Sequence, residues 1–219
     1  MRNLFCVYRA TAYTGRMGAD ETTPEYASKD ALRAMSHPVR IDIIQFLRHR
    51  ESARAADLAE ALGVAANSMS YHLRILAKAG LIEDAPELAR DRRDRVWRMP
   101  QRELSIRVDA EGQPDGYRGA VDQVGLAAIE WIRSGWIAQD YGGAGRENFG
   151  RGTVTISSAR LTFEEAQSCI DEILAVIDRY SSRNRDEDGN DLEEGNPDLD
   201  SYRIAGIVLP DVGRHDTAS

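Results

Sequence analysis

Long apolar runs, cysteines and a cleavable leader are all missing or scarce in this chain of 219 residues. No stretch approaches the roughly 18 to 20 apolar residues of a membrane-spanning helix, which excludes a transmembrane protein. The two cysteines, Cys6 and Cys169, are too few and too far apart for a disulfide framework. The start carries no apolar segment followed by a cleavage site, so we expect a cytoplasmic protein.

Positive charge is also in deficit. The formal net charge of −8 argues against non-specific coating of nucleic acid, which requires an excess of Lys and Arg. The deficit is uneven, because residues 30–100 carry 12 Lys and Arg against 10 Asp and Glu, a net charge of +2, and the rest carries −10. Only Lys29 and Lys78 are lysines, so nearly all basic residues are arginines. Genome base composition is the first explanation of this excess, and a need for bidentate contacts by the guanidinium is the second.

The chain is long enough to bury a substantial core. Its secondary-structure patterns begin at residue 28. Residues 1–27 have little periodicity and include a second methionine, Met17, which predicts a disordered arm or an overextended start. From residue 28 a first helix places Leu32 and Met35 on one face. Pro38 then restarts a second helix, which has a wide apolar stripe.

Two further helices and a hairpin follow. The spacing predicts helices over 55–62 and 66–79, separated by a short turn at Gly63 and ended by Gly80, which is a helix-turn-helix unit. Extended residues 81–85 and 95–99 flank an arginine-rich loop and predict a β-hairpin, the wing (residues 81–99). Residues 103–108 alternate and predict another strand, and residues 111–116 read as a linker.

From residue 117 onward, the sequence pattern predicts helices that alternate with strands. A helix covers 117–141 and ends at the glycines 142–145, a loop rather than a phosphate cradle because it follows a helix. A strand covers 153–156, and Thr162 with Glu165 forms a capping box that opens the next helix. That helix is expected to bury Ala166, Cys169, Ile170, Ile173, Ile177 and Tyr180. Residues 185–200 carry eight carboxylates and predict a mobile acidic loop; a strand over 202–209 and a tail, 211–219, follow.

The helix over 66–79 has an outer face whose residue types suit DNA. Amides and hydroxyls read base edges, whereas Arg and Lys bind guanine or phosphate. The outward residues are Asn67, Ser68, Ser70, Tyr71, Arg74 and Lys78. The alternative is an ordinary solvated surface, and the basic residues of the wing favour DNA contact.

This stretch resembles the ArsR-like winged helix-turn-helix transcriptional regulators of bacteria. The matching parts are Leu32, Met35, Pro38, Arg40, the run 58–63, Ser70, His72, Leu73, Leu76, the run 79–82 and the wing residues 95–99. The resemblance implies that 66–79 is the recognition helix and that Arg92, Arg93 and Arg95 grip a flanking minor groove or phosphates. It also implies a homodimer on an inverted repeat of double-stranded DNA. Arg40 either holds a phosphate or forms an internal ion pair, and His72 either contacts phosphate or bonds the helix scaffold.

Three departures from that family are visible. Ala65 and Arg54 precede their helices where a Ser, Thr or Asp cap is usual, and His37 stands where an acidic residue is usual. The metal ligands of many such repressors are missing, so we expect a regulator that senses no metal and needs no cofactor. The residues that begin at Asn184 resemble a calcium-binding loop, but Gly195 occupies the position where that loop needs a bidentate glutamate. We therefore expect no calcium site there.

These patterns together predict an α+β, mainly helical fold. Residues 28–110 form the winged helix-turn-helix domain, and residues 115–210 form an α+β part for dimerisation and, as a second role, for sensing an unknown small-molecule effector. The helix predicted over 117–141 carries Trp131, Ile132, Trp136 and Tyr141. We expect these residues to form a core with a dimer interface in the first place, and an effector pocket in the second. The predicted function is a DNA-binding transcriptional regulator, a repressor by hypothesis. An interaction adaptor without DNA binding is the alternative, and no catalytic motif supports an enzyme.

Overall fold

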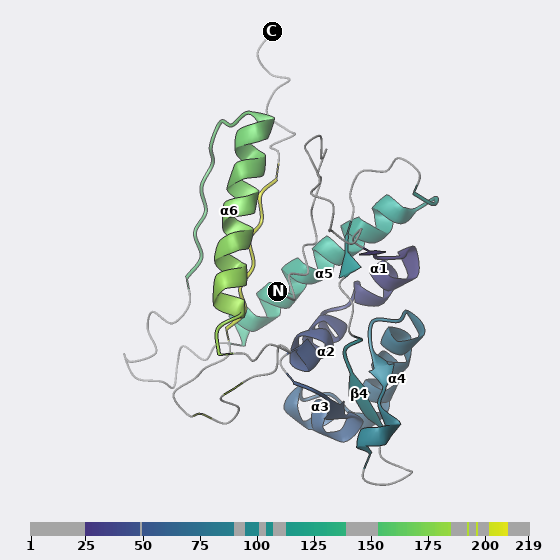
Figure 1. The fold of residues 1–219 in the computed structure, drawn as a ribbon. Helices are drawn as coiled ribbons and strands as arrows, with labels where there is room; N and C mark the ends of the chain where they lie inside the picture. The colour runs from purple at the N-terminus through teal and green to yellow at the C-terminus, as the bar shows by residue number, and fades with distance from the viewer. Residues whose placement is uncertain are drawn as a thin grey trace, which may run out of the picture.

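The computed structural model describes residues 25–48, 50–89, 95–100, 104–106, 113–138, 153–184, 192, 196 and 202–209. The elements in chain order are β1 (Glu25–Tyr26), α1 (Lys29–Met35), α2 (Pro38–Arg48), β2 (Ala53–Arg54), α3 (Ala55–Ala61), α4 (Ala66–Lys78), β3 (Glu83–Asp84), the 3-10 helix η1 (Pro86–Leu88), β4 (Val96–Arg98), β5 (Leu104–Ser105), α5 (Tyr117–Ile137) and α6 (Phe163–Ser181). Helices α1 to α4 and the short strands form one group against α5, and α6 stands apart from that group (Figure 1).

The first two helices begin as the sequence predicts. The Ser28 hydroxyl accepts a hydrogen bond of 3.1 Å from the amide of Ala31 and caps α1, whose Leu32 and Met35 are buried. The chain then turns at His37, and Pro38 is the first residue of α2. Proline suits this position because its missing N–H would have no partner in the helix.

Glycines end α3 and α4 with the same hydrogen-bond pattern. Gly63 and Gly80 adopt left-handed φ values of 62° and 69°. After α3, the amide of Val64 donates to the carbonyl of Ala59 at 2.9 Å; after α4, the amide of Leu81 donates to Leu76 at 3.0 Å. Both are Schellman closures, which favour glycine because a Cβ is strained in this conformation. The predicted helix-turn-helix unit is therefore confirmed, with its turn at Gly63.

The wing strands β3 and β4 pair with β2 in a three-stranded antiparallel sheet of order β2-β4-β3. The predicted hairpin is present, since Glu83 lies opposite Arg98 and Asp84 lies opposite Trp97. Sequence reasoning missed β2 and η1. It also extended the N-terminal arm too far, because β1 pairs in parallel with β5 and Ala27 is buried. The missed strands β1 and β2 are each two residues long, which is too short to show the alternating pattern that predicts a strand.

The core lies between the helix-turn-helix unit and the first half of α5. Leu32, Ile43, Leu58 and Leu73 are buried there, and Val121 of α5 is buried against them. The α+β, mainly helical fold with an N-terminal winged helix-turn-helix is confirmed. Among the described residues, no helix combines the length and apolar character needed to cross a membrane.

Helix α6 begins as predicted but lacks the predicted burial. Thr162 accepts from the amide of Glu165 at 3.2 Å, and the Glu165 carboxylate accepts from the amide of Thr162 at 2.7 Å, which is the expected capping box. No residue of α6 is buried; Ala166, Cys169, Ile170, Ile173 and Ile177 are half-buried, and Tyr180 is exposed. The prediction that this face forms a core is wrong, because no other helix packs over it in the described chain.

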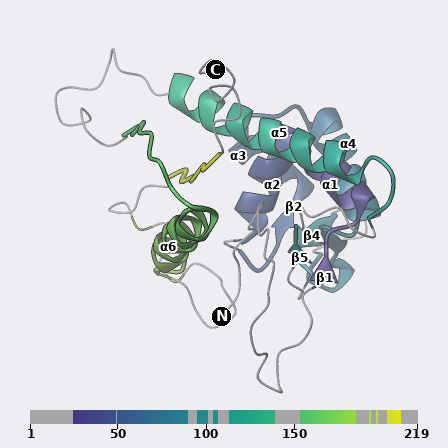
Figure 2. The ribbon, with the colours of Figure 1, turned by 90° about the horizontal axis from the view of Figure 1, so that it is seen from above.

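The two strands predicted beside α6 do not form. Residues 153–156 and 202–209 belong to no sheet in the described parts of the chain. Segment 202–209 runs between α6 and α5 in both views (Figures 1 and 2). It packs so closely on α6 that a Cβ at Gly206 would lie 2.4 Å from Cγ2 of Ile173. An extended segment seated on a helix has no neighbouring strand to pair with, whatever its β propensity.

Helix α5 also ends earlier than predicted. Its last residue is Ile137, and Ala138 forms the C-cap. Several predicted features lie outside the described residues: the arm 1–24, the arginines Arg92 and Arg93, Tyr141, the glycines 142–145, most of the acidic loop 185–200 and the tail 211–219.

Candidate nucleic-acid interface

Helix α4 presents one apolar and one polar face. Met69, Leu73 and Leu76 are buried against the core. The six residues predicted to point outward are all exposed: Asn67, Ser68, Ser70, Tyr71, Arg74 and Lys78. Tyr71 is the most prominent large side chain, with 57% of its surface exposed. The amphipathic spacing therefore placed this face correctly.

Three of these outward side chains are bonded to their own helix, and the first is Asn67, whose Oδ1 accepts from the amide of Ser68 at 2.8 Å. The Ser70 hydroxyl donates to the carbonyl of Ala66 at 2.9 Å, and the Arg74 Nε donates to the carbonyl of Ser70 at 3.1 Å. The Arg74 bond uses only one of five guanidinium N–H groups, and Arg74 forms no ion pair with any described residue. Its two terminal nitrogens thus remain positioned for a bidentate acceptor such as guanine or a phosphate.

The start of α4 has the weak cap that the sequence predicts. Neither Ala65, before α4, nor Arg54, before α3, provides a side-chain cap. Arg54 instead pairs with Asp57 in the first turn of α3, at 2.8 Å from Nε and 2.5 Å from a terminal nitrogen. The negative charge of Asp57 in the first turn interacts favourably with the positive end of the helix dipole. This interaction partly substitutes for a cap at the start of α3.

The residue before Pro38 has a role that the sequence did not indicate. The Nδ1 of His37 accepts a hydrogen bond of 3.2 Å from the amide of Val39, which caps α2. The His37 ring also lies 4.8 Å from the ring of His72 on α4. An imidazole can accept at Nδ1 only when that nitrogen is unprotonated, so the cap requires neutral His37.

Arg40 and His72 lie half-buried at the junction of α2 and α4 and not on the outward face. The Arg40 Nε and the His72 Nδ1 are both buried with no hydrogen-bond partner among the described residues. Burial first, and then the charges of His37 and Arg40, lower the pKa of His72; burial and then Arg40 lower that of His37. Neither the internal ion pair expected of Arg40 nor the scaffold bond expected of His72 is seen in the described structure.

The two arginines of the wing that the structure describes, Arg95 and Arg98, are paired with carboxylates, which the sequence analysis missed. Arg98 bonds Glu83 at 2.7 Å and Glu87 at 2.6 Å, and these bonds raise the pKa of its guanidinium. Arg95 lies 3.9 Å from Asp84 and 5.6 Å from the centre of the Trp97 ring. The cross-strand register, with Glu83 opposite Arg98, is the signal that could have revealed the first pair.

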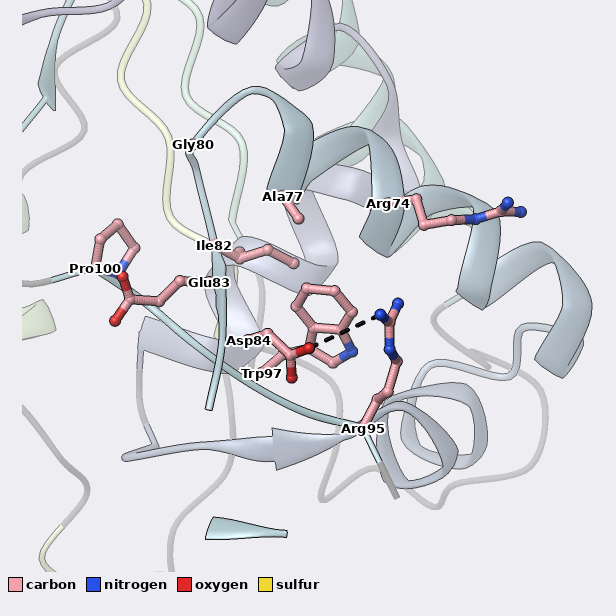
Figure 3. Close-up of a pocket in the computed structure, with 9 residues that line it drawn as sticks. All are labelled: Arg74, Ala77, Gly80, Ile82, Glu83, Asp84, Arg95, Trp97 and Pro100. Carbon is pink, nitrogen blue, oxygen red and sulfur yellow. Dashed lines mark ion pairs between the residues drawn. The ribbon is translucent and has the colours of Figure 1, made fainter. Parts of the chain in front are cut away.

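An open hollow separates the wing from α4 (Figure 3). Trp97 and Ile82 lie within it, Arg95 and Asp84 face each other on the wing side, and Arg74 extends from α4 on the other side. The predicted residues Arg74 and Arg95 thus border one hollow from two different elements. Nothing in the described chain groups three or more His, Cys, Asp or Glu side chains as a metal site.

The aromatic residues predicted for a dimer or effector site lie far from this hollow. Trp131 is half-buried and donates from Nε1 to Asp42 of α2 at 2.6 Å. The guanidinium of Arg203 stacks on its ring at 4.8 Å. Ile132 is half-buried, and Trp136 is 42% exposed. Trp131 is thus bonded to α2.

The comparisons with known proteins agree with this geometry. Residues 35–85 match the family model described as a helix-turn-helix domain. A segment of 52 residues is 35% identical to the P fimbrial regulatory protein KS71A of Escherichia coli, covering 24% of this chain and 68% of that protein. The chain belongs to the winged helix-turn-helix family.

The matched span of the winged helix-turn-helix domain contains α2, α3, α4 and β3. It therefore includes the outward face of α4 and the carboxylates Glu83 and Asp84. A mutant form of Lactococcus lactis ZitR is also similar at 15% identity, over 65% of this chain and 73% of that one, with a TM-score of 0.26. A score this low is no basis for transferring any property to the winged helix-turn-helix chain.

Proposed function

We propose that this protein is a sequence-specific, double-stranded DNA-binding transcriptional regulator without enzymatic activity. The observation that carries the proposal is the outward face of α4, which is the second helix of a helix-turn-helix unit and exposes six polar or basic residues. The second helix of such a unit enters the major groove. The regulatory name of the Escherichia coli relative supports the same function.

In this proposal α4 reads base edges in the major groove. Ser70, Tyr71 and Arg74 lie along the middle of the exposed face and are the foremost base contacts. Asn67, Ser68 and Lys78 flank them and contact bases or phosphates. Arg40 and His72, at the edge of α4, reach phosphate only if their side chains move outward from the junction with α2.

The wing contacts the DNA backbone beside the site read by α4. Arg95 borders the hollow between the wing and α4, and Arg92 and Arg93 belong to the same loop. Arginine suits phosphate because its planar fork donates two parallel hydrogen bonds. These contacts add affinity for every sequence and depend on salt.

We further propose a cytoplasmic homodimer of the ArsR-like type that acts as a repressor at an inverted repeat. The second half of α5 supports a dimer, because it exposes apolar residues that a lone chain leaves in water. These residues are Leu126, Ile129, Trp136 and Ile137. A two-fold dimer would place two α4 helices about 34–36 Å apart, one turn of DNA. A pocket for a small-molecule effector at the same helix is the second interpretation of its aromatic residues.

Selection from a random duplex library tests this function directly. The full chain should enrich one sequence motif, and a Tyr71→Ala/Arg74→Ala variant with an unchanged circular dichroism spectrum should not. A footprint on the enriched duplex should cover two half-sites in inverted orientation. Failure of the folded wild-type chain to enrich any sequence would refute DNA reading by α4.

The balanced charge of the wing favours one other function, a protein-interaction adaptor built on the same fold, because residues 81–99 carry five arginines against five Asp and Glu. Arg98 is neutralised by Glu83 and Glu87, and the whole chain carries a net charge of −8. An adaptor would bind a protein through the α4 face and would bind scrambled and genomic duplexes equally poorly. The duplex selection separates the two functions, because an adaptor enriches nothing.

A further inference from the structure

The carboxylates of the wing stand beside the arginines that would otherwise contact DNA. Glu83, Asp84 and Glu87 are exposed side chains of β3 and η1. Arg98 is held by two of them through short bonds of 2.7 and 2.6 Å. Two close bonds to two carboxylates keep this guanidinium on the wing, so Arg98 offers little free positive charge to a phosphate.

Arg95 is held differently. Its only ion pair among the described residues is with Asp84, at 3.9 Å, and both side chains are substantially exposed, 62% and 42%. A pair this long and this exposed is weak and can be exchanged for another acceptor. Figure 3 shows the Arg95 guanidinium at the edge of the hollow, between Asp84 and the side of α4 that carries Arg74.

We infer that Asp84 is a specificity-determining residue, which holds Arg95 away from the DNA backbone unless α4 has found its own sequence. This inference rests on the proposed function. Sequence-independent affinity arises when Lys and Arg displace counterions from phosphates. A carboxylate beside Arg95 lowers that contribution by neutralising the guanidinium.

The exchange takes place when α4 docks. Base contacts from α4 bring the hollow against the DNA, and a phosphate then competes with Asp84 for Arg95. On a scrambled sequence α4 makes no such contacts, so the weak pair with Asp84 persists. The wing therefore adds affinity to the correct site and little affinity elsewhere, which suits a chain whose net charge is −8.

Asp84→Asn in the full chain tests this role by fluorescence anisotropy on a short duplex of scrambled sequence. We expect binding to tighten about two- to five-fold, the range that an exposed ion pair supplies. The slope of log K against log salt should steepen by about one unit, because one more phosphate is neutralised. Affinity for the selected duplex should rise less, so the ratio of specific to non-specific affinity falls.

Asp171→Asn is the matched control, because Asp171 is exposed on α6 and the change removes the same charge. It should leave both binding curves unchanged. Arg95→Ala supplies the second arm: alone it should scarcely alter scrambled binding, and in the Asp84→Asn background it should remove the whole gain. Unchanged circular dichroism spectra exclude a folding effect for each variant.

Four results would overturn the role of Asp84. They are equal gains from Asp84→Asn and Asp171→Asn, a gain that survives Arg95→Ala, weaker binding by Asp84→Asn, and no change at all. In each of these the wild-type chain still binds its selected duplex, so the proposed function stands. A wild-type chain that binds no duplex refutes the proposed function itself, and the inference fails with it.

Discussion

The indole Nε1 of Trp131 donates a hydrogen bond of 2.6 Å to the Asp42 carboxylate, which joins α5 to α2 across 89 residues of sequence. The same Asp42 oxygen accepts from a terminal nitrogen of Arg203 at 3.0 Å. One carboxylate of α2 is therefore bonded to two further segments, the long helix α5 and segment 202–209.

Removal of the Asp42 carboxylate should destabilise the fold. Asp42→Ala leaves Trp131 Nε1 and one terminal nitrogen of Arg203 without this acceptor, and we expect the free energy of unfolding in urea to fall by about 1–3 kcal/mol. Asp42→Asn keeps an oxygen acceptor of the same shape and should lose less. Equal stability of Asp42→Ala and wild type would show that the contact has no energetic weight.

Two glycines of α5 should respond oppositely to alanine. At Gly125 a new Cβ meets nothing within 4 Å, so Gly125→Ala should stabilise the helix by about 0.5–1 kcal/mol. At Gly135 a Cβ would lie 2.8 Å from Cδ of Arg203, so Gly135→Ala should displace Arg203 and lose that gain. Thermal unfolding of the pair measures the difference, and an equal gain at both sites would contradict the close approach of Arg203.

Acid should weaken the junction between α2 and α4. The pKa values of His37 and His72 are lowered mainly by burial, so the folded chain holds both rings neutral below the ordinary pKa of 6.5. As the pH falls through 6.5 towards the folded pKa values, the unfolded chain binds protons that the folded chain does not. The free energy of unfolding is therefore highest above pH 6.5 and decreases on acidification.

His37→Asn provides the control for this pH dependence. Asparagine keeps an oxygen that can accept from the amide of Val39 but does not titrate. Urea unfolding across the same pH range should then give a shallower slope than that of wild type. A slope identical to wild type would place the titration elsewhere in the chain.

Arg74→Ala should weaken specific DNA binding. Loss of a bidentate contact costs about 1–3 kcal/mol, roughly five- to 150-fold in affinity. A fluorescence titration on the selected duplex measures the change, with Arg179→Ala as the control because Arg179 is exposed on α6. If Arg74→Ala and Arg179→Ala bind equally well, Arg74 makes no specific contact.

The parts of the fold that depend on local conformational preferences were predictable from the sequence. Pro38 starts α2 because its fixed φ and missing N–H suit a first helical position, and Thr162 caps α6 through its hydroxyl. Gly63 and Gly80 end α3 and α4 because their φ values are positive. The outward face of α4 followed from helical periodicity alone. All these signals lie within a few residues of the structure that they specify.

The parts that depend on distant segments were not predictable. The strands β1 and β2 are two residues long and exist only through their partners, whereas β5 lies within the strand predicted over 103–108. The pairing of Arg98 with Glu83 needs the register of the wing, and the bond between Trp131 and Asp42 needs the packing of α5. The apolar face of α6 was correctly located, but periodicity carries no information on whether the same chain covers it.

The distance along the chain between Asp42 and Arg203, 161 residues, also orders the assembly of the molecule. The helix-turn-helix unit closes through contacts that are short in sequence, so it can fold while later residues are still being synthesised. Arg203 can reach Asp42 only after the chain up to residue 203 has left the ribosome. The C-terminal segment is therefore added to a preformed domain, and its docking is the last of these steps to be completed.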